Sequence, residues 1–175
     1  MEFLRPTGRA LISSGYESVN QKTLDGVRKR ACASDYRRRI AAIHAEGIIA
    51  SGNFMFGFDE EGPEIFDDTL AFLDETKMLH ANFTAEIPFP GTPAWRHCRD
   101  EGRLLSLDYD DYVGRDHVLV HPRRMSPEHL RHGIRRLALA LYGPVRRFRL
   151  AMAAARNRQL LAPSSVPPVP SRSLR

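Results

Sequence analysis

The segment 48–58 (IIASGNFMFGF) is a nearly continuous run of apolar and small residues, and no other segment constrains the fold as strongly. A strand that is covered on both faces requires such a run, whereas a strand with one face in water alternates between apolar and polar residues. The run therefore predicts a strand inside a parallel sheet.

Strand and helix patterns precede this run. Segment 9–13 (RALIS) is short, apolar and followed by Ser14-Gly15, which predicts a first buried strand that ends in a turn. Asn20 is suited to cap a helix, and a second helix is predicted over 36–46 by its apolar face. Gly47 fits the end of that helix.

The same alternation continues after the run. Apolar residues recur at helical spacing after Pro63, segment 82–87 predicts a strand, and segment 94–101 predicts a helix. Crossovers of this length require parallel strands. An ordinary eight-stranded barrel needs about 250 residues, so the expected fold is α/β, an incomplete (β/α) partial TIM-type barrel of about three parallel strands.

The last third of the chain differs in composition. Residues 1–120 hold 14 Lys and Arg against 20 Asp and Glu, whereas residues 121–175 hold 12 Arg and one acid, Glu128. Segment 107–122 predicts a loop and a short strand, and a basic helix is predicted from Ser126 to about Asn157, interrupted at Gly143-Pro144. We expect a half-barrel over 1–105, a basic helical extension over 106–160 and a disordered tail over 161–175.

Composition narrows the class of protein. The chain has 175 residues, 42% of them hydrophobic and 27% charged, which is typical of a globular protein with one core. No apolar run approaches the roughly 18 residues that span a bilayer, and the first residues lack the apolar segment of a signal peptide, so a cytoplasmic protein is expected. The basic last third lacks interleaved aromatic residues and any base-reading motif, which favours a solvated helical face over a nucleic-acid module.

Cysteine and histidine patterns predict no metal site. Cys32 and Cys98 are too few for a disulfide scaffold and too few to ligate an iron–sulfur cluster. His117 and His121 would lie about 13 Å apart along a strand, too far to share an ion. His129 and His132 have neither a carboxylate nor a third ligand beside them.

Candidate ligand-binding residues follow the predicted strands, because ligands of parallel α/β folds gather at the carboxyl ends of the strands. Gly57 suits an ordinary turn as well as a ligand contact, and Phe56 suits the core as well as a stacking surface. Glu17 and Glu86 stand at strand ends beside apolar residues, where a carboxylate needs either an internal partner or a polar ligand.

Three segments together resemble the later part of the radical S-adenosylmethionine superfamily core, and in particular its cobalamin-binding subgroup. They are GYESVNQKTL (15–24), NFMFGFD (53–59) and PFPGTP (88–93), and the likeness extends from Arg9 to His132. The resemblance implies a six-stranded partial barrel that binds a [4Fe–4S] cluster through a CxxxCxxC loop. Members of the superfamily cleave S-adenosylmethionine reductively to a radical that acts on a substrate, here unknown.

The resemblance also implies which residues surround S-adenosylmethionine. Glu17 and Ser18 would face the nucleotide, and Lys29 would meet the methionine carboxylate, although Arg28 and Arg30 are its neighbours. The complete set of implied cofactor-binding residues is Glu17, Ser18, Lys29, Phe56, Gly57, Glu86, Pro88 and Phe89.

The chain departs from the family pattern because it has no CxxxCxxC motif and no cobalamin domain. We therefore expect a fragment of a radical S-adenosylmethionine enzyme that is inactive alone, with ligands for the [4Fe–4S] cluster and for cobalamin absent. The alternative is a non-catalytic remnant or a subunit that pairs with a separate N-terminal half-barrel polypeptide. Exposed apolar surface on half a barrel also predicts self-association.

Overall fold

The structure is a computed structural model that describes residues 11–112, 117–144 and 148. Its centre is a three-stranded parallel sheet in the order β1-β2-β3, an α/β arrangement that is consistent with a partial β/α fold. The strands are β1 (Leu11–Glu17), β2 (Ile49–Phe56) and β3 (His80–Ala85). The helices are α1 (Gln21–Gly26), α2 (Ala33–Ala45), α3 (Ile65–Glu75), α4 (Pro93–Asp100), the 3-10 helix η2 (Tyr109–Tyr112) and α5 (Pro127–Tyr142).

Local signals explain where several helices begin. The side chains of Asn20, Thr92 and Ser126 accept hydrogen bonds from backbone N–H groups in the first turns of α1, α4 and α5. Pro93 and Pro127 follow two of these caps at the first helical position, where a missing N–H costs nothing. Gly47 has a φ of 72° just after α2, which agrees with its predicted place at a helix end.

Strand bounds differ from those predicted. The predicted end of the first strand at Ser13 is wrong, because Ser14 and Gly15 stay in register with Gly52 and Asn53 instead of turning. β3 begins and ends two residues earlier than the predicted 82–87. Pairing nevertheless continues past its end, since the Glu86 N–H donates to the carbonyl of Phe56.

The C-terminal part of the described chain is irregular before α5. Within the predicted 107–122 loop and strand, η2 forms one turn, and Val120 makes an isolated antiparallel bridge to Leu104. α5 ends at Tyr142, and the predicted continuation of this helix to Asn157 lies mostly outside the described residues, as does the predicted tail over 161–175.

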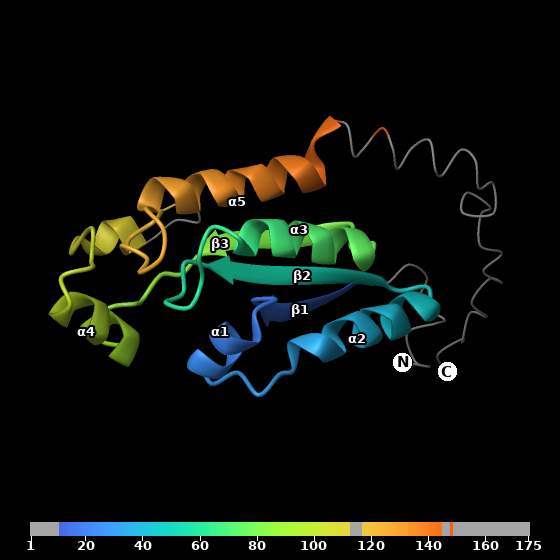
Figure 1. Cartoon of the computed structure of the whole chain (residues 1–175), viewed down its shortest axis with the longest axis horizontal. Coiled ribbons are helices and arrows are strands. Elements are labelled where there is room, and N and C mark those ends of the chain that lie inside the picture. Colours follow the sequence, from blue (N-terminus) through green and yellow to red (C-terminus); the bar gives the residue numbers. More distant parts are fainter. Residues whose placement is uncertain (1–10, 113–116, 145–147, 149–175) are drawn as a thin grey trace, which may run out of the picture.

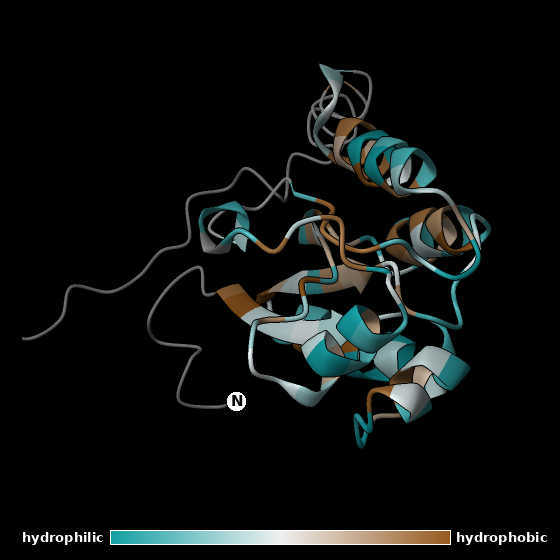
Figure 2. Cartoon of the chain, turned by 90° about the vertical axis from the view of Figure 1, so that its left-hand side faces the viewer, coloured by the Kyte–Doolittle hydropathy of each residue, from teal (hydrophilic) through white to brown (hydrophobic). Residues whose placement is uncertain are grey.

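The hydrophobic core lies between the sheet and the helices. Phe54 and Phe56 of β2 are buried, and their rings contact Phe72 and Phe66 of α3. In Figure 1, α2 lies on the β1 side of the sheet, while α3 and α5 lie on the β3 side. Figure 2 looks onto the left-hand end of that view, toward which the β2 arrow points, and shows hydrophilic residues over much of the outer helical surface.

The opposite face of the sheet carries polar side chains at alternate positions. Ser13, Ser51, Asn53, His80 and Asn82 form this polar face. Asn53 donates to the hydroxyl of Ser13 at 3.1 Å, Asn82 donates to the side-chain oxygen of Asn53 at 2.8 Å, and the hydroxyl of Ser51 lies 2.7 Å from Nδ1 of His80. The apolar run at 48–58 thus forms the central strand of a parallel sheet as predicted, but the described helices cover one face of it, and Ser51 and Asn53 lie on the other face. Hydrogen bonds between strands satisfy the polar groups instead.

Candidate functional site

The carboxyl ends of the three strands lie at one end of the molecule, because the strands are parallel. Glu17 ends β1, Gly57 follows β2, and Glu86 follows β3. In Figure 1 the arrow of β2 points toward the end where α4 lies, and α1 lies below that end of the sheet. The candidate site is built from these strand ends, α1 and α4.

Glu17 and Lys29 form an ion pair at the end of β1. The Lys29 ammonium lies 2.8 Å from Oε1 of Glu17 and donates to the carbonyl of Gly15 at 2.7 Å. Both side chains are about 30% exposed (29% for Lys29 and 30% for Glu17). The pair therefore offers a ligand one cation and one carboxylate side by side.

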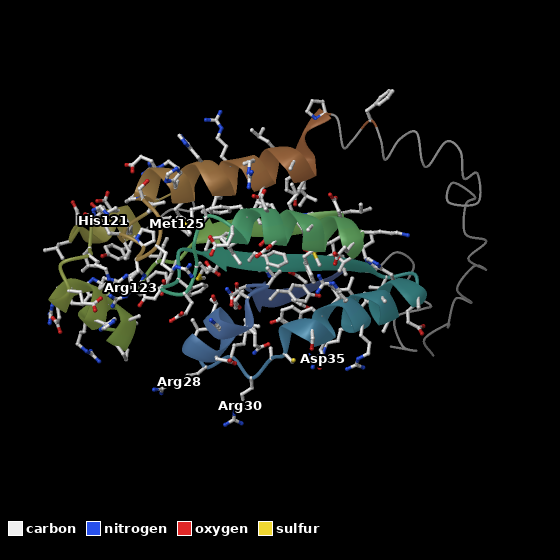
Figure 3. All side chains as sticks on the ribbon, in the orientation of Figure 1. Arg28, Arg30, Asp35, His121, Arg123 and Met125 are labelled. Atoms are coloured by element: carbon white, nitrogen blue, oxygen red, sulfur yellow. The ribbon has the colours of Figure 1, made fainter. Side chains whose placement is uncertain are left out.

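The backbone around this pair is bent to bring the two groups together. The register with β2 shifts between Gly15 and Glu17, and Glu17 has a φ of 62°, in the left-handed region that non-glycine residues rarely occupy. Arg28 also has a positive φ of 55° immediately before Lys29. Arg28 and Arg30 project outward from the molecule (Figure 3), so Lys29 is the basic residue of this trio that faces Glu17.

Ser18 lies next to Glu17 but turns into the protein. It is 1% exposed, and its hydroxyl donates to Oε1 of Glu61 at 2.6 Å. Glu61 is 0% exposed, and its other oxygen accepts from the Gly57 N–H at 3.1 Å. These contacts, which we call the Ser18-Glu61 link, join the loop after β1 to the loop after β2.

Burial controls the ionisation of Glu61. It raises the pKa of this carboxyl to about 7, against the opposing effect of hydrogen bonds from Ser18 and the backbone N–H groups of Gly57 and Phe58, which favour the charged form. Sequence reasoning did not single out Glu61, because in the acidic run 59–61 it looks like one of three solvated loop residues. The sequence feature that indicates its role is its position four residues after Gly57, because a side chain at that distance can accept a hydrogen bond from the backbone of the turn.

Phe56 and Gly57 take different places. The Phe56 side chain is 0% exposed and its ring centroid lies 5.2 Å from that of Phe66, so its side chain belongs to the core. Gly57 has a φ of 101°, and a Cβ there would lie 2.8 Å from a methyl carbon of Leu130. Both the backbone angle and the close approach of α5 favour glycine at this turn.

Glu86 borders a cavity of about 430 Å³ between α1, α4 and the loop after β2. Phe58, Val27, Ala94 and Cys98 supply apolar surface to this cavity. Burial, followed by the negative charge of Asp59, raises the pKa of Glu86 to about 7, while Arg103 acts in the opposite direction. A carboxyl with this pKa exchanges protons near neutral pH.

The remaining predicted site residues lie on the segment after Glu86. Pro88 is buried, and Phe89 is 59% exposed. The Thr92 side chain bonds to the Phe89 carbonyl at 2.7 Å and caps α4. This segment therefore positions α4 at the carboxyl end of the sheet.

Four charged residues form a network beside the cavity. Arg103 contacts Asp59 at 2.9 Å and Glu101 at 2.8 Å. Arg123, labelled near α4 in Figure 3, contacts Asp59 at 3.0 Å and also pairs with Glu101. Hydrogen bonds from the two arginines hold the pKa of Glu101 below its usual range. The network joins the loop after β2 to α4 and to the segment before α5.

Cysteine and histidine side chains do not gather into a metal centre among the residues that the structure describes. Cys32 is exposed, while Cys98 is buried and burial raises the pKa of its thiol. These two thiols do not fit a [4Fe–4S] cluster, which needs three or four. In the same described part of the chain, each helix is too short or too polar to traverse a lipid bilayer.

Comparison with known proteins supports the predicted relationship with the radical S-adenosylmethionine superfamily. The chain is 29% identical over 138 residues to a bacteriochlorophyllide d C-12(1)-methyltransferase of Chlorobaculum tepidum, covering 78% of this chain and 29% of that protein. It is 27% identical over 112 residues to an anaerobic magnesium-protoporphyrin IX monomethyl ester cyclase of Cereibacter sphaeroides, covering 64% of this chain and 18% of that protein.

A shorter match involves a tRNA-2-methylthio-N(6)-dimethylallyladenosine synthase of Erythrobacter litoralis. It is 32% identical over 80 residues, 45% of this chain and 18% of that protein. No protein-family model matches the chain. The matched part of the chain thus corresponds to less than a third of the length of each of these relatives.

Proposed function

We propose that this chain supplies the later part of a radical S-adenosylmethionine domain and that the Glu17–Lys29 pair holds the amino-acid end of S-adenosylmethionine. The observation that carries the proposal is the pair itself, a partly exposed cation and carboxylate 2.8 Å apart at a strand end. An α-amino acid carries one positive and one negative group, and such a pair complements both.

The site divides the predicted residues by role. Glu17 and Lys29 would contact the ligand directly, and Glu86 would border its apolar surroundings through the adjoining cavity. Ser18 acts instead through the Ser18-Glu61 link, which positions the backbone beside Glu17. Phe56 would contribute its backbone, since its side chain is buried in the core.

For the reaction of the whole protein, we propose the chemistry that the names of its relatives give, which is methyl transfer or ring formation. The cluster that starts radical chemistry in this superfamily would be ligated by residues outside this chain, and cobalamin would be bound outside it as well. We propose that those residues belong to a preceding half-barrel, either covalently joined or separate. Leu11, 51% exposed on the outer strand β1, lies at the edge where such a half-barrel would add its strands.

The assignment is tested by measuring the affinity for S-adenosylmethionine with calorimetry. The measurement is made on the chain alone and on the chain combined with the N-terminal part of a relative. Glu17→Gln and Lys29→Met should each weaken binding about ten- to a hundredfold, because one end of the ligand zwitterion loses its partner. His129→Ala is the matched surface control and should bind as the wild type does. Wild-type affinity in both Glu17→Gln and Lys29→Met would contradict the assignment.

A further inference from the structure

A second cavity, of about 380 Å³, lies away from the candidate site, between the outer strand β3 and α5. Phe83, Val118, Ile134 and Ala138 contribute apolar surface to it. Cavities of this size that are mostly apolar, with a few polar groups at defined positions, are typical of small-molecule sites. The polar groups here are two arginines, a tyrosine and Asn82.

Arg131 and Arg135 line the cavity from one side of α5, four residues apart. Neither guanidinium makes a hydrogen bond or an ion pair with another residue in the described part of the chain, although Arg131 lies near enough to Glu128 to lower the pKa of that carboxyl. Arg136, one residue further along, pairs with Asp67 at 2.8 Å. Two cations beside an apolar cavity complement an anion that carries an apolar body.

The outer edge of β3 is partly closed against an added strand. The Tyr142 hydroxyl donates to the carbonyl of Ala81 at 2.7 Å and accepts from its N–H at 3.0 Å. One hydroxyl therefore occupies both outward backbone groups that an added strand would need at this position. This contact favours a small molecule over an extended peptide.

The acidic side chain nearest in sequence to the two arginines is Glu128, three residues before Arg131, and Arg131 lowers the pKa of its carboxyl. Residues 145–175, which follow α5, contain seven arginines and no Asp or Glu. One nearby carboxylate does not neutralise two guanidiniums, so a net positive charge beside the cavity is left for an anionic ligand.

We propose that the cavity between β3 and α5 binds a small amphipathic anion, with its apolar body against Phe83 and Ile134 and its carboxylate or phosphate on Arg131 and Arg135. This site is independent of the S-adenosylmethionine assignment. It lies on the outer strand, where a ligand enters without disturbing the Glu17–Lys29 pair.

The proposal is tested by titrating the full 175-residue chain separately with octanoate, octyl phosphate and octan-1-ol. NMR spectra of the chain measure the binding of each compound. Octanoate or octyl phosphate should bind saturably with one site per chain, and the tighter of the two identifies the head group. Octan-1-ol, which has the same apolar body without charge, should bind at least tenfold more weakly. Equal binding of octan-1-ol, or no saturable binding of either anion, would overturn the proposal.

Variants of α5 separate a specific site from general attraction to a basic helix. Arg131→Gln and Arg135→Gln should each weaken binding of the preferred anion about tenfold, and Ala138→Phe should abolish it by filling the cavity. Arg136→Gln is the matched control on the same helix and should leave binding unchanged. A loss in Arg136→Gln equal to that in Arg131→Gln, or full binding by a folded Ala138→Phe variant, would refute the cavity as the site.

Discussion

The Lys29 ammonium lies 2.8 Å from Oε1 of Glu17, and a shift in strand register brings the two groups together at the end of β1. The same ammonium donates to the carbonyl of Gly15, so the pair lies directly over a residue with no side chain. A Cβ on Gly15 would lie 2.6 Å from Oε1 of Glu17 and 3.3 Å from the Lys29 nitrogen. The geometry of the pair therefore depends on this glycine.

Gly15→Ala should separate the pair while leaving the fold intact. The added methyl meets the ends of two flexible side chains, which can move, so the free energy of unfolding should change by less than about 1 kcal/mol. NMR of the Lys29 ammonium should show loss of the contact with Glu17, and S-adenosylmethionine should bind more weakly. Gly26→Ala is the control, since a Cβ at Gly26 meets nothing within 4 Å. Retention of the pair in Gly15→Ala would contradict the expected clash.

The buried carboxyl of Glu61 should make stability depend on pH. Its pKa is about 7 in the folded protein and returns to its ordinary value of 4.5 on unfolding, so the folded state holds the proton more tightly between these values. The free energy of unfolding should therefore fall as pH rises from about 4.5 to about 7, by on the order of 1–3 kcal/mol. Chemical denaturation at a series of pH values measures this slope.

Glu61→Gln should flatten that dependence, because the amide does not titrate. Glu86, whose pKa is also raised to about 7, contributes a slope of the same sign, so the double variant Glu61→Gln/Glu86→Gln should be flatter still. An unchanged slope in Glu61→Gln would mean that Glu61 does not carry the effect.

The charges around Glu86 should move its pKa in opposite directions. Arg103→Gln removes the cation that lowers the pKa of Glu86, so the value should rise above about 7. Asp59→Asn removes the neighbouring negative charge, so the value should fall. Carboxyl NMR titration of the two variants gives the comparison, and shifts of the same sign in both would show that disruption of the network dominates over direct charge.

Contact between α3 and α5 depends on Gly133. A Cβ on Gly133 would lie 2.2–2.4 Å from ring carbons of Phe66, which is buried and cannot move freely. Gly133→Ala should therefore lower the free energy of unfolding by about 1–3 kcal/mol despite the better helix propensity of alanine. Thermal unfolding beside Gly26→Ala measures the difference. A Gly133→Ala protein as stable as Gly26→Ala would show that the two helices separate easily.

The order and direction of the strands were predictable because local patterns determine them. The length of the crossovers requires parallel strands, and the expected partial barrel places the strand at 48–58 between its two sequence neighbours. The end of β1 was not predictable. Ser14-Gly15 has turn composition, and pairing with residues nearly forty positions away overrides that preference.

The candidate site was only partly accessible from sequence for a similar reason. Glu17 and Lys29 could be named from the family resemblance, but nothing local distinguishes Lys29 from Arg28 and Arg30. The Ser18-Glu61 link and the contact of Arg103 with Asp59 join residues 43 and 44 positions apart. Which of several neighbouring charges turns inward depends on the packed fold, because burial of a charge is stable only where its partners are already in place.

The Ser18-Glu61 link has a consequence for the entropy of ligand binding. It ties the loop that presents Glu17 to the turn at Gly57 before any ligand arrives. A ligand that contacts either loop therefore meets a surface whose backbone is already restrained, and less conformational freedom is lost when it binds. The two loops act as one preorganised unit. A change that breaks the link should therefore weaken binding of a ligand that contacts either loop.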